Sequence, residues 1–218
     1  KFTFASNANA TNVGSMTSIR QSPAGQSSET HGYITGGTPH SNVIEKFSFT
    51  VDGNSTSVGS LTITRTYASG HQSTTHGYTG GGNHSSGPPV TDDIDKFTFA
   101  SDANATFVGD LTVARTGNIG QSSFSHGYSC GGSTGATKYN IIEKFTFASD
   151  ANATDVGDLT VNKSYCGSQS STTHGYVSGG NDGSTLNVIE KFTFASDANA
   201  TDSADLSQTR MEPAGTQY

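Results

Sequence analysis

Four histidines recur at matching places along the chain and are its first candidates for metal chemistry. Imidazole nitrogens bind zinc at about 2.0 to 2.1 Å, so several histidines must converge on one point to hold an ion. Residues at equivalent positions of successive repeats are separated by a whole repeat and do not converge. We therefore expect structural turn residues, and we predict no metal site and no cofactor. The four are His31, His76, His126 and His174.

Two repeated sets of charged residues could do other chemistry. The basic set could form an anion-binding crown, and the acidic set, which precedes the repeated lysines, could supply general acids. Their regular recurrence favours a structural role, in which each basic residue ties one repeat to an acidic group or carbonyl of its neighbour. The basic set is Arg20, Arg65, Arg115, Lys163 and Arg210, and the acidic set is Glu45, Asp95, Glu143 and Glu190.

Recognisable catalytic motifs are missing from the sequence. No nucleophile, base and orienting residue stand together. Residues 181–185 form only a fragment of a sialidase Asp box, and Cys130 and Cys166 lack the context of a copper oxidase. The two cysteines occupy non-equivalent positions, so we expect free thiols. The sequence predicts a protein that is not an enzyme, and a polysaccharide-active enzyme is the less favoured alternative.

The element that must position all these residues is a repeat, best seen in residues 144–180. The repeated lysines (Lys1, Lys46, Lys96, Lys144, Lys191) lie 45, 50, 48 and 47 residues apart. The spacing from this lysine to the basic residue is always 19, and from there to the histidine always 11. All length variation therefore falls in one loop per repeat, which follows the pair of adjacent glycines at the end of residues 144–180 and of the other copies.

Each repeat has the pattern of four short strands. Phe145 and Phe147 alternate as in a strand, an Asp-Ala-Asn turn follows, and Val156, Leu159 and Val161 suggest a second apolar strand. A polar Gln-Ser-Ser strand comes next, which we expect to line a water-filled central channel. It turns at the histidine into a last strand that ends on the glycine pair. Helical periodicity is absent.

Composition limits the fold and the partners. Only 31% of the 218 residues are hydrophobic and 27 are glycine, so burial must be spread thinly between repeats. The net charge of −7 argues against nucleic acid. No apolar run is long enough for a spanning helix, so we predict no membrane insertion.

The pattern of a basic residue, a polar strand, His-Gly-Tyr-x-x-Gly-Gly, a variable loop and Val-Ile-Glu-Lys-Phe resembles the kelch repeat. The polar, Ala-Asn-Ala-Thr-rich version is also similar to kelch-type repeats of marine bacteriophages. The chain departs from the family in having no Trp; Val13, Val58, Val108 and Val156, or the following Leu, should fill that space. The glycine pairs are Gly36 and Gly37, Gly81 and Gly82, Gly131 and Gly132, and Gly179 and Gly180.

The resemblance implies an all-β fold, a single kelch-like β-propeller domain over residues 1–218 with four-stranded antiparallel blades, about five in number. The blades are expected at 1–20 (partial), 21–65, 66–115, 116–163, 164–210 and 211–218 (partial). The fifth blade would lack its second strand. We therefore expect either that the chain is a segment of a longer propeller or that a partner supplies the strand.

One face of such a propeller should carry recognition. The loop after the glycine pair and the linker into the first strand should share this face and vary between repeats, for example in residues 38–42 and 83–92. The Asp-Ala-Asn hairpins and His-Gly turns should lie opposite. Aromatic and polar side chains on the variable face are our ligand-binding candidates: Tyr67, His84, Tyr139, Tyr165 and Asp182.

These expectations lead to a structural and binding module. The resemblance implies a bacteriophage virion appendage, such as a tail fibre, or an extracellular adhesin. Its partners would be other structural proteins of the assembly, or a host-surface protein or glycan. A soluble, lectin-like carbohydrate-binding propeller is the alternative.

Overall fold

The computed structural model describes residues 1–2, 9–85 and 89–215. These residues form an all-β structure of sixteen strands in four four-stranded antiparallel sheets, without a helix in the described ranges. The predicted partial blades 1–20 and 211–218 and the variable loop 83–92 each include residues outside those ranges.

One sheet lies within each of the ranges 21–65, 66–115, 116–163 and 164–210, and the strands of each pair in sequence order. The first sheet contains β1 (Ala24–Ser27), β2 (His31–Thr35), β3 (Ser41–Ser48) and β4 (Thr56–Arg65); the second contains β5 (Ser69–Gln72), β6 (His76–Gly80), β7 (Asp93–Thr98) and β8 (Thr106–Asp110). The third contains β9 (Ile119–Ser122), β10 (His126–Cys130), β11 (Ile141–Thr146) and β12 (Thr154–Asp158); the fourth contains β13 (Gly167–Ser170), β14 (His174–Ser178), β15 (Val188–Thr193) and β16 (Thr201–Asp205).

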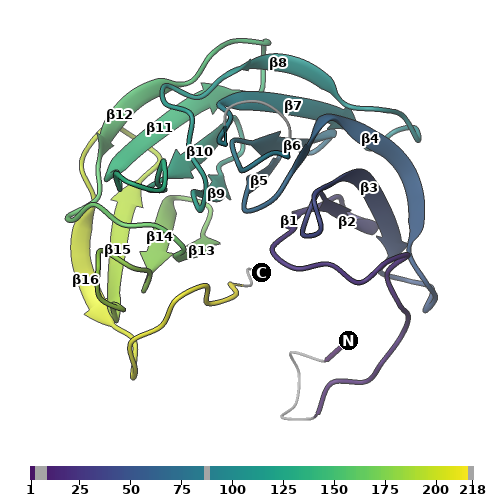
Figure 1. Cartoon of the computed structure of the whole chain (residues 1–218), viewed down its shortest axis with the longest axis horizontal. Helices are drawn as coiled ribbons and strands as arrows, with labels where there is room; N and C mark the ends of the chain where they lie inside the picture. Colours follow the sequence, from purple (N-terminus) through teal and green to yellow (C-terminus); the bar gives the residue numbers. More distant parts are fainter. Residues whose placement is uncertain (3–8, 86–88, 216–218) are drawn as a thin grey trace.

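The sheets follow one another around an open arc (Figure 1). The short first strands β1, β5, β9 and β13 stand innermost, and β4, β8, β12 and β16 form the outer rim. The chain reaches the centre again at its C-terminal end, while the N-terminal segment lies beside the first sheet. Polar first strands line the interior, as predicted.

Two details of the predicted strands were wrong. The repeated histidines are the first residues of β2, β6, β10 and β14, and the turns lie just before them. The strand predicted to contain Leu159 and Val161 ends at Asp158. Beyond this point the Thr160 N–H donates to Glu190 of the next sheet, at 2.7 Å.

The apolar core is divided among the junctions between sheets. At the first junction Tyr33, Ile44 and Leu61 of the first sheet pack against Phe97 and Ala105 of the second. Equivalent residues fill the other two junctions. Val58, Val108 and Val156 pack against these clusters together with the buried Leu61, Leu111 and Leu159, as predicted. Cys130 and Cys166 lie buried in the third cluster as free thiols, also as predicted.

An aromatic stack repeats at each junction. The tyrosine of one sheet's second strand stacks on the second phenylalanine of the next sheet: Tyr33 on Phe99 at 4.7 Å, Tyr78 on Phe147 at 4.9 Å and Tyr128 on Phe194 at 4.7 Å between ring centroids. Offset stacks of this kind add to the stabilisation that comes from burial. Neighbouring sheets are therefore held in a fixed register by aromatic side chains.

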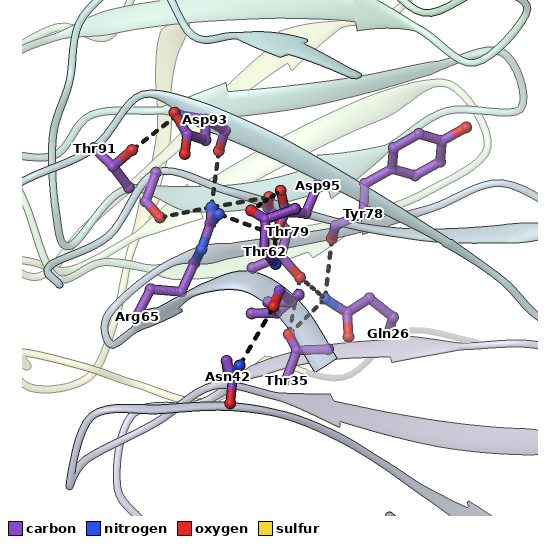
Figure 2. A network of polar contacts seen from close by, with 12 residues as sticks. Gln26, Thr35, Asn42, Thr62, Arg65, Tyr78, Thr79, Thr91, Asp93 and Asp95 are labelled. Carbon is purple, nitrogen blue, oxygen red and sulfur yellow. Dashed lines mark hydrogen bonds and ion pairs between the residues drawn. The ribbon is translucent and has the colours of Figure 1, made fainter. Parts of the chain in front are cut away.

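Fully buried ion pairs also cross the junctions. Figure 2 shows Arg65, at the end of the first sheet, beside Asp95 of the second, with 3.0 Å between Nη2 and Oδ2. The Thr62 N–H and hydroxyl donate to the same carboxylate at 2.8 and 2.7 Å. Arg115 pairs with Glu143 in the same way, and Lys163 with Glu190 at 2.5 Å. These contacts confirm the prediction that the repeated basic and acidic residues tie neighbouring repeats.

The N-terminal segment uses the same contacts on the first sheet. Arg20 and Thr17 both bind the buried Glu45 carboxylate, to which Ser55 also donates. Burial alone would raise the pKa of Glu45, but the hydrogen bonds from Ser55 and Thr17 and the charge of Arg20 outweigh it, and the pKa falls below its ordinary value. The segment thus acts toward the first sheet as the outer strand of a preceding sheet.

A further set of charges links the sheets at the surface. Four of the five repeat lysines each reach the aspartate in the hairpin that follows the third strand of the next sheet along the chain. These aspartates are more than half exposed, so each pair contributes at most about 1 kcal/mol. The pairs are Lys1 with Asp52, Lys46 with Asp102, Lys96 with Asp150 and Lys144 with Asp197.

Glycine permits a close approach between the outer strands and the next hairpin. A Cβ atom on Gly59 would lie 2.2 Å from the Ala103 carbonyl oxygen, and one on Gly157 2.5 Å from that of Ala198. The same close approach occurs at Gly14 and Gly109. β16 has no described sheet packed beyond it, and alanine (Ala204) takes the place of this glycine there. The valine that directly precedes the glycine in the other outer strands is replaced by Ser203.

His71 is a departure from the repeat in the interior. It is fully buried where the other three sheets carry a glutamine. Its Nε2 lies 2.9 Å from Ser69 Oγ, its Nδ1 lies 3.2 Å from the Gln121 carbonyl oxygen, and its ring meets Phe145 edge-on. Burial lowers the pKa of His71 to about 4.

The pH dependence of stability should report on this histidine. The folded-state pKa lies below the ordinary value, so the stabilisation is present above about pH 6.5 and is lost as the pH falls toward 4. Between pH 7 and pH 5 the loss should be about 2 kcal/mol. Urea unfolding at both pH values should show that His71→Gln, which restores the residue of the other sheets, loses about 2 kcal/mol less than the wild type. Equal losses would contradict the assignment.

Candidate functional site

The variable loops and linkers lie on one face, as the sequence predicts. Isolated bridges pair the linker into each first strand with the segment after the glycine pair, as in Thr66 with Asn83 and Thr116 with Ser133. On the opposite side, the hairpin after β3 meets the turn before β2, where the Phe49 N–H donates to the Thr30 carbonyl. Conserved packing and variable surface are thus separated within each repeat.

The linkers converge on an open row of four backbone hydrogen bonds that joins five residues. The Tyr67 N–H donates to Ser22, Gly117 to Tyr67, Tyr165 to Gly117 and Glu212 to Tyr165, at 2.8 to 3.1 Å. Each donor or acceptor stands two residues after a repeated basic residue. All five have φ between 50° and 64°, a conformation that non-glycine residues adopt rarely and that is enriched at binding sites.

Two of the ligand-binding candidates belong to this row of hydrogen-bonded residues and contact each other. The rings of Tyr67 and Tyr165 are 5.4 Å apart at an interplanar angle of 78°, an edge-to-face contact. Both side chains are half-buried. Burial, followed by the neighbouring Tyr67 and Glu212, raises the pKa of Tyr165, so its phenol stays protonated and can donate a hydrogen bond. The pair presents aromatic and hydroxyl groups together.

A cavity of about 1200 Å³ lies beside this row of hydrogen bonds. Ala68, which directly follows Tyr67, lines it. Farther in, the lining is polar and comes from the first strands, including Gln72, Gln121, Ser122 and Gln169. The cavity therefore offers amide and hydroxyl groups that can form hydrogen bonds, and the tyrosine pair, which is not part of its lining, lies next to it along the chain.

The other candidates do not join this pair. Tyr139 is held by its backbone, whose N–H donates to Gly132 at 2.9 Å. Asp182 is exposed and its carboxylate accepts the Ser184 N–H at 2.8 Å within its own loop. His84 is half-buried in the loop that continues into the residues outside the described ranges.

The glycine pairs and repeated histidines have structural contacts. All eight paired glycines have φ between 58° and 109°. The second glycine of each pair donates its N–H to the carbonyl of a repeated basic residue, for example Gly82 to Arg115 at 2.8 Å. Each repeated histidine forms a hydrogen bond with the side-chain hydroxyl of the residue before it, as His76 Nδ1 does with Thr75 at 2.8 Å. The four histidines lie in four different sheets.

Sequence reasoning missed a cluster of three carboxylates. Asp92, Asp93 and Asp110 place ligand-type oxygens within 4.8 Å of one another, and they are the only such group of metal-ligating side chains among the described residues. Burial, followed by the charges of Asp92 and Asp93, raises the pKa of Asp110. The available signal was Asp92 itself, since the first and third sheets carry Asn42 and Asn140 at this position.

Asp92 makes a stability prediction possible. Asn42 and Asn140 donate to the carbonyls of Leu61 and Leu159 at 3.5 and 3.4 Å, which a carboxylate cannot do. Asp92→Asn supplies that donor and removes repulsion, so it should raise the free energy of unfolding by about 1 kcal/mol at pH 7. Asn140→Asp is the matched reverse change and should lower it. Chemical denaturation measures both, and a destabilised Asp92→Asn protein would contradict the argument.

Comparisons with known proteins add no relative: no protein-family model matches the chain, and no curated protein matches it. Within the described residues, no helix is long and apolar enough to cross a membrane. The argument for function therefore depends on the geometry of the site itself.

Proposed function

We propose that the chain is a non-catalytic binding module, built as a kelch-like β-propeller of about five blades, that binds a glycan at the rim of its central cavity. The observation that carries the proposal is the Tyr67–Tyr165 contact. Aromatic faces suit the C–H faces of sugar rings, and the glutamine and serine side chains below suit their hydroxyls.

The row of backbone hydrogen bonds supports both parts of the proposal. It has five members although only four complete sheets are described, and Glu212 of the C-terminal segment is the fifth. Four members stand just before first strands, and a fifth member at the equivalent position of the C-terminal segment favours five blades. These hydrogen bonds also hold the backbone of the two tyrosines in place before a ligand binds, which lowers the entropic cost of binding.

A glycan array tests the proposed function. The wild-type chain should bind a restricted set of glycans, and Tyr67→Ala or Tyr165→Ala should weaken binding at least tenfold, because ring stacking and burial are both lost. Tyr139→Ala, on the same face but outside the pair, is the matched control and should bind as the wild type does. Binding that survives both rim substitutions would refute the site.

We also propose that the module serves as a surface component of a bacteriophage particle or as an extracellular adhesin, where glycan binding would mediate attachment. Mass spectrometry of purified particles tests the first role. The chain should be present in stoichiometric amount, and its absence from them would eliminate the virion role while leaving the binding site in place.

A further inference from the structure

The wall of the central cavity has almost no charge. Among the described residues that line it, only Lys1 and Asp52 have charged side chains, and these pair with each other at 2.8 Å between Nζ and Oδ1. The residues outside the described ranges have no charged side chain to add. The remaining polar side chains of the wall are amides and hydroxyls, so no unpaired charge faces a ligand there.

The cations of the interior are not available to a ligand either. Three repeated basic residues are fully buried, each is paired with a carboxylate of the next sheet, and none of them lines the cavity: Arg65, Arg115 and Lys163. His71 stands between the wall residues Gly70 and Gln72, but burial lowers its pKa to about 4, so its imidazole is neutral at pH 7. An acidic ligand in the cavity would therefore find no cation among the described residues to pair with.

The tyrosine pair beside the cavity has a carboxylate as a neighbour. The Glu212 N–H donates to the Tyr165 carbonyl at 2.8 Å, and the negative charge of Glu212 contributes to the raised pKa of Tyr165. The exposed Arg210, two residues earlier, does not line the cavity. The approach past Tyr165 is thus unfavourable for an anion.

The wall does offer hydrogen bonds of both kinds. Gln72 Oε1 accepts the Ser27 N–H at 3.3 Å, and Gln72 Nε2 has no partner among the described residues, so it can donate to a ligand. Ser122 Oγ accepts the Gln72 N–H at 3.0 Å and keeps its hydroxyl proton for a further bond. Amide and hydroxyl groups of this kind match the donors and acceptors of sugar hydroxyl and acetamido groups.

We propose that the glycan bound here is uncharged at its non-reducing end, with hydroxyl and acetamido groups but no carboxylate, sulfate or phosphate. This inference rests on the glycan binding proposed above. An anion that enters the cavity would lose its hydration and gain no ion pair, whereas a neutral sugar only exchanges hydrogen bonds with water for hydrogen bonds with the wall. The net charge of −7 adds repulsion at long range.

An array of matched glycan pairs tests this inference with the full chain. Each neutral glycan, attached through its reducing end, is printed beside a derivative whose terminal sugar carries a carboxylate or a sulfate. The acidic derivatives should bind at least about tenfold more weakly than their neutral parents. Binding of the neutral parents should change less than about twofold between about 50 and about 500 mM NaCl, because no ion pair is screened.

The outcomes separate this inference from the proposed function. An acidic derivative that binds as tightly as its parent, or more tightly, would overturn the inference and leave glycan binding in place. No binding of any glycan by the folded chain would refute the proposed function and, with it, the inference.

Gly25→Lys is a gain-of-function variant for the same array. Gly25 is exposed in β1 and lines the cavity, and a Cβ atom there meets nothing within 4 Å. The added ammonium group should strengthen binding of the acidic derivatives severalfold at low salt, and high salt should remove the gain. Gly25→Gln, of similar length without the charge, is the matched control and should show no gain. Thermal unfolding confirms that both variants are folded, and equal binding of the acidic derivatives by the two would overturn the inference.

Discussion

Replacing Arg115 by methionine is expected to lower the free energy of unfolding by about 3 to 5 kcal/mol. Arg115 and its partner Glu143 are both fully buried, and Thr112 donates to the same carboxylate. Methionine removes the positive charge but leaves the carboxylate in an interior that cannot solvate it. Denaturant titration at pH 7 measures the loss.

Two comparisons separate the lost pairing from lost packing. Replacing the pair together, by Arg115→Met with Glu143→Leu, should recover most of the stability, because no charge remains buried. Lys96→Met removes a charge of the same sign from the same repeat, but its partner Asp150 is more than half exposed, so the loss should stay below about 1 kcal/mol. A double variant as unstable as Arg115→Met would show that the charge is not the cause.

Gly59→Ala is expected to lower the free energy of unfolding by about 3 kcal/mol. The added methyl group would lie 2.2 Å from the Ala103 carbonyl oxygen, which is backbone and cannot rotate away. The second sheet would have to move outward and loosen the core between Tyr33 and Phe97.

The matched control for this change is Gly53→Ala. A Cβ atom there meets nothing within 4 Å, and the equivalent residue in the other hairpins is alanine. Reduced freedom of the unfolded chain should make Gly53→Ala neutral or slightly stabilising, by up to about 1 kcal/mol. Equal unfolding midpoints for the two variants would exclude the close approach as the cause.

Much of the fold could be predicted because the same strand and turn patterns recur in every repeat. A strand pattern such as Phe145-x-Phe147 is weak once, but its recurrence at constant spacing excludes chance. The same recurrence indicated that Arg65 and Asp95 have structural partners. Spacing alone left open whether each basic residue meets an acidic group or a carbonyl of its neighbour, because that depends on how the sheets pack.

The candidate site was less predictable for the same reason. Tyr67 and Tyr165 were selected because their linkers vary, yet they belong to repeats that are not adjacent in sequence. Their contact arises because the linkers of all repeats meet in one row of hydrogen bonds, and that meeting depends on how all the sheets are arranged in the arc. The carboxylates of Asp92 and Asp110 come from a loop and an outer strand, and only the folded second sheet brings them together.

The edge formed by β16 differs from the other outer strands because Ala204 stands where they have glycine. A fifth blade could not approach β16 as closely as the described sheets approach one another, because its hairpin carbonyl would meet the Ala204 methyl group where even the glycine counterparts leave less than 3 Å for a Cβ atom. Ser203 would also replace an apolar contact with a hydroxyl. Any blade that follows β16 must therefore pack at a wider spacing than the described sheets, so the spacing of blades around the arc is not uniform.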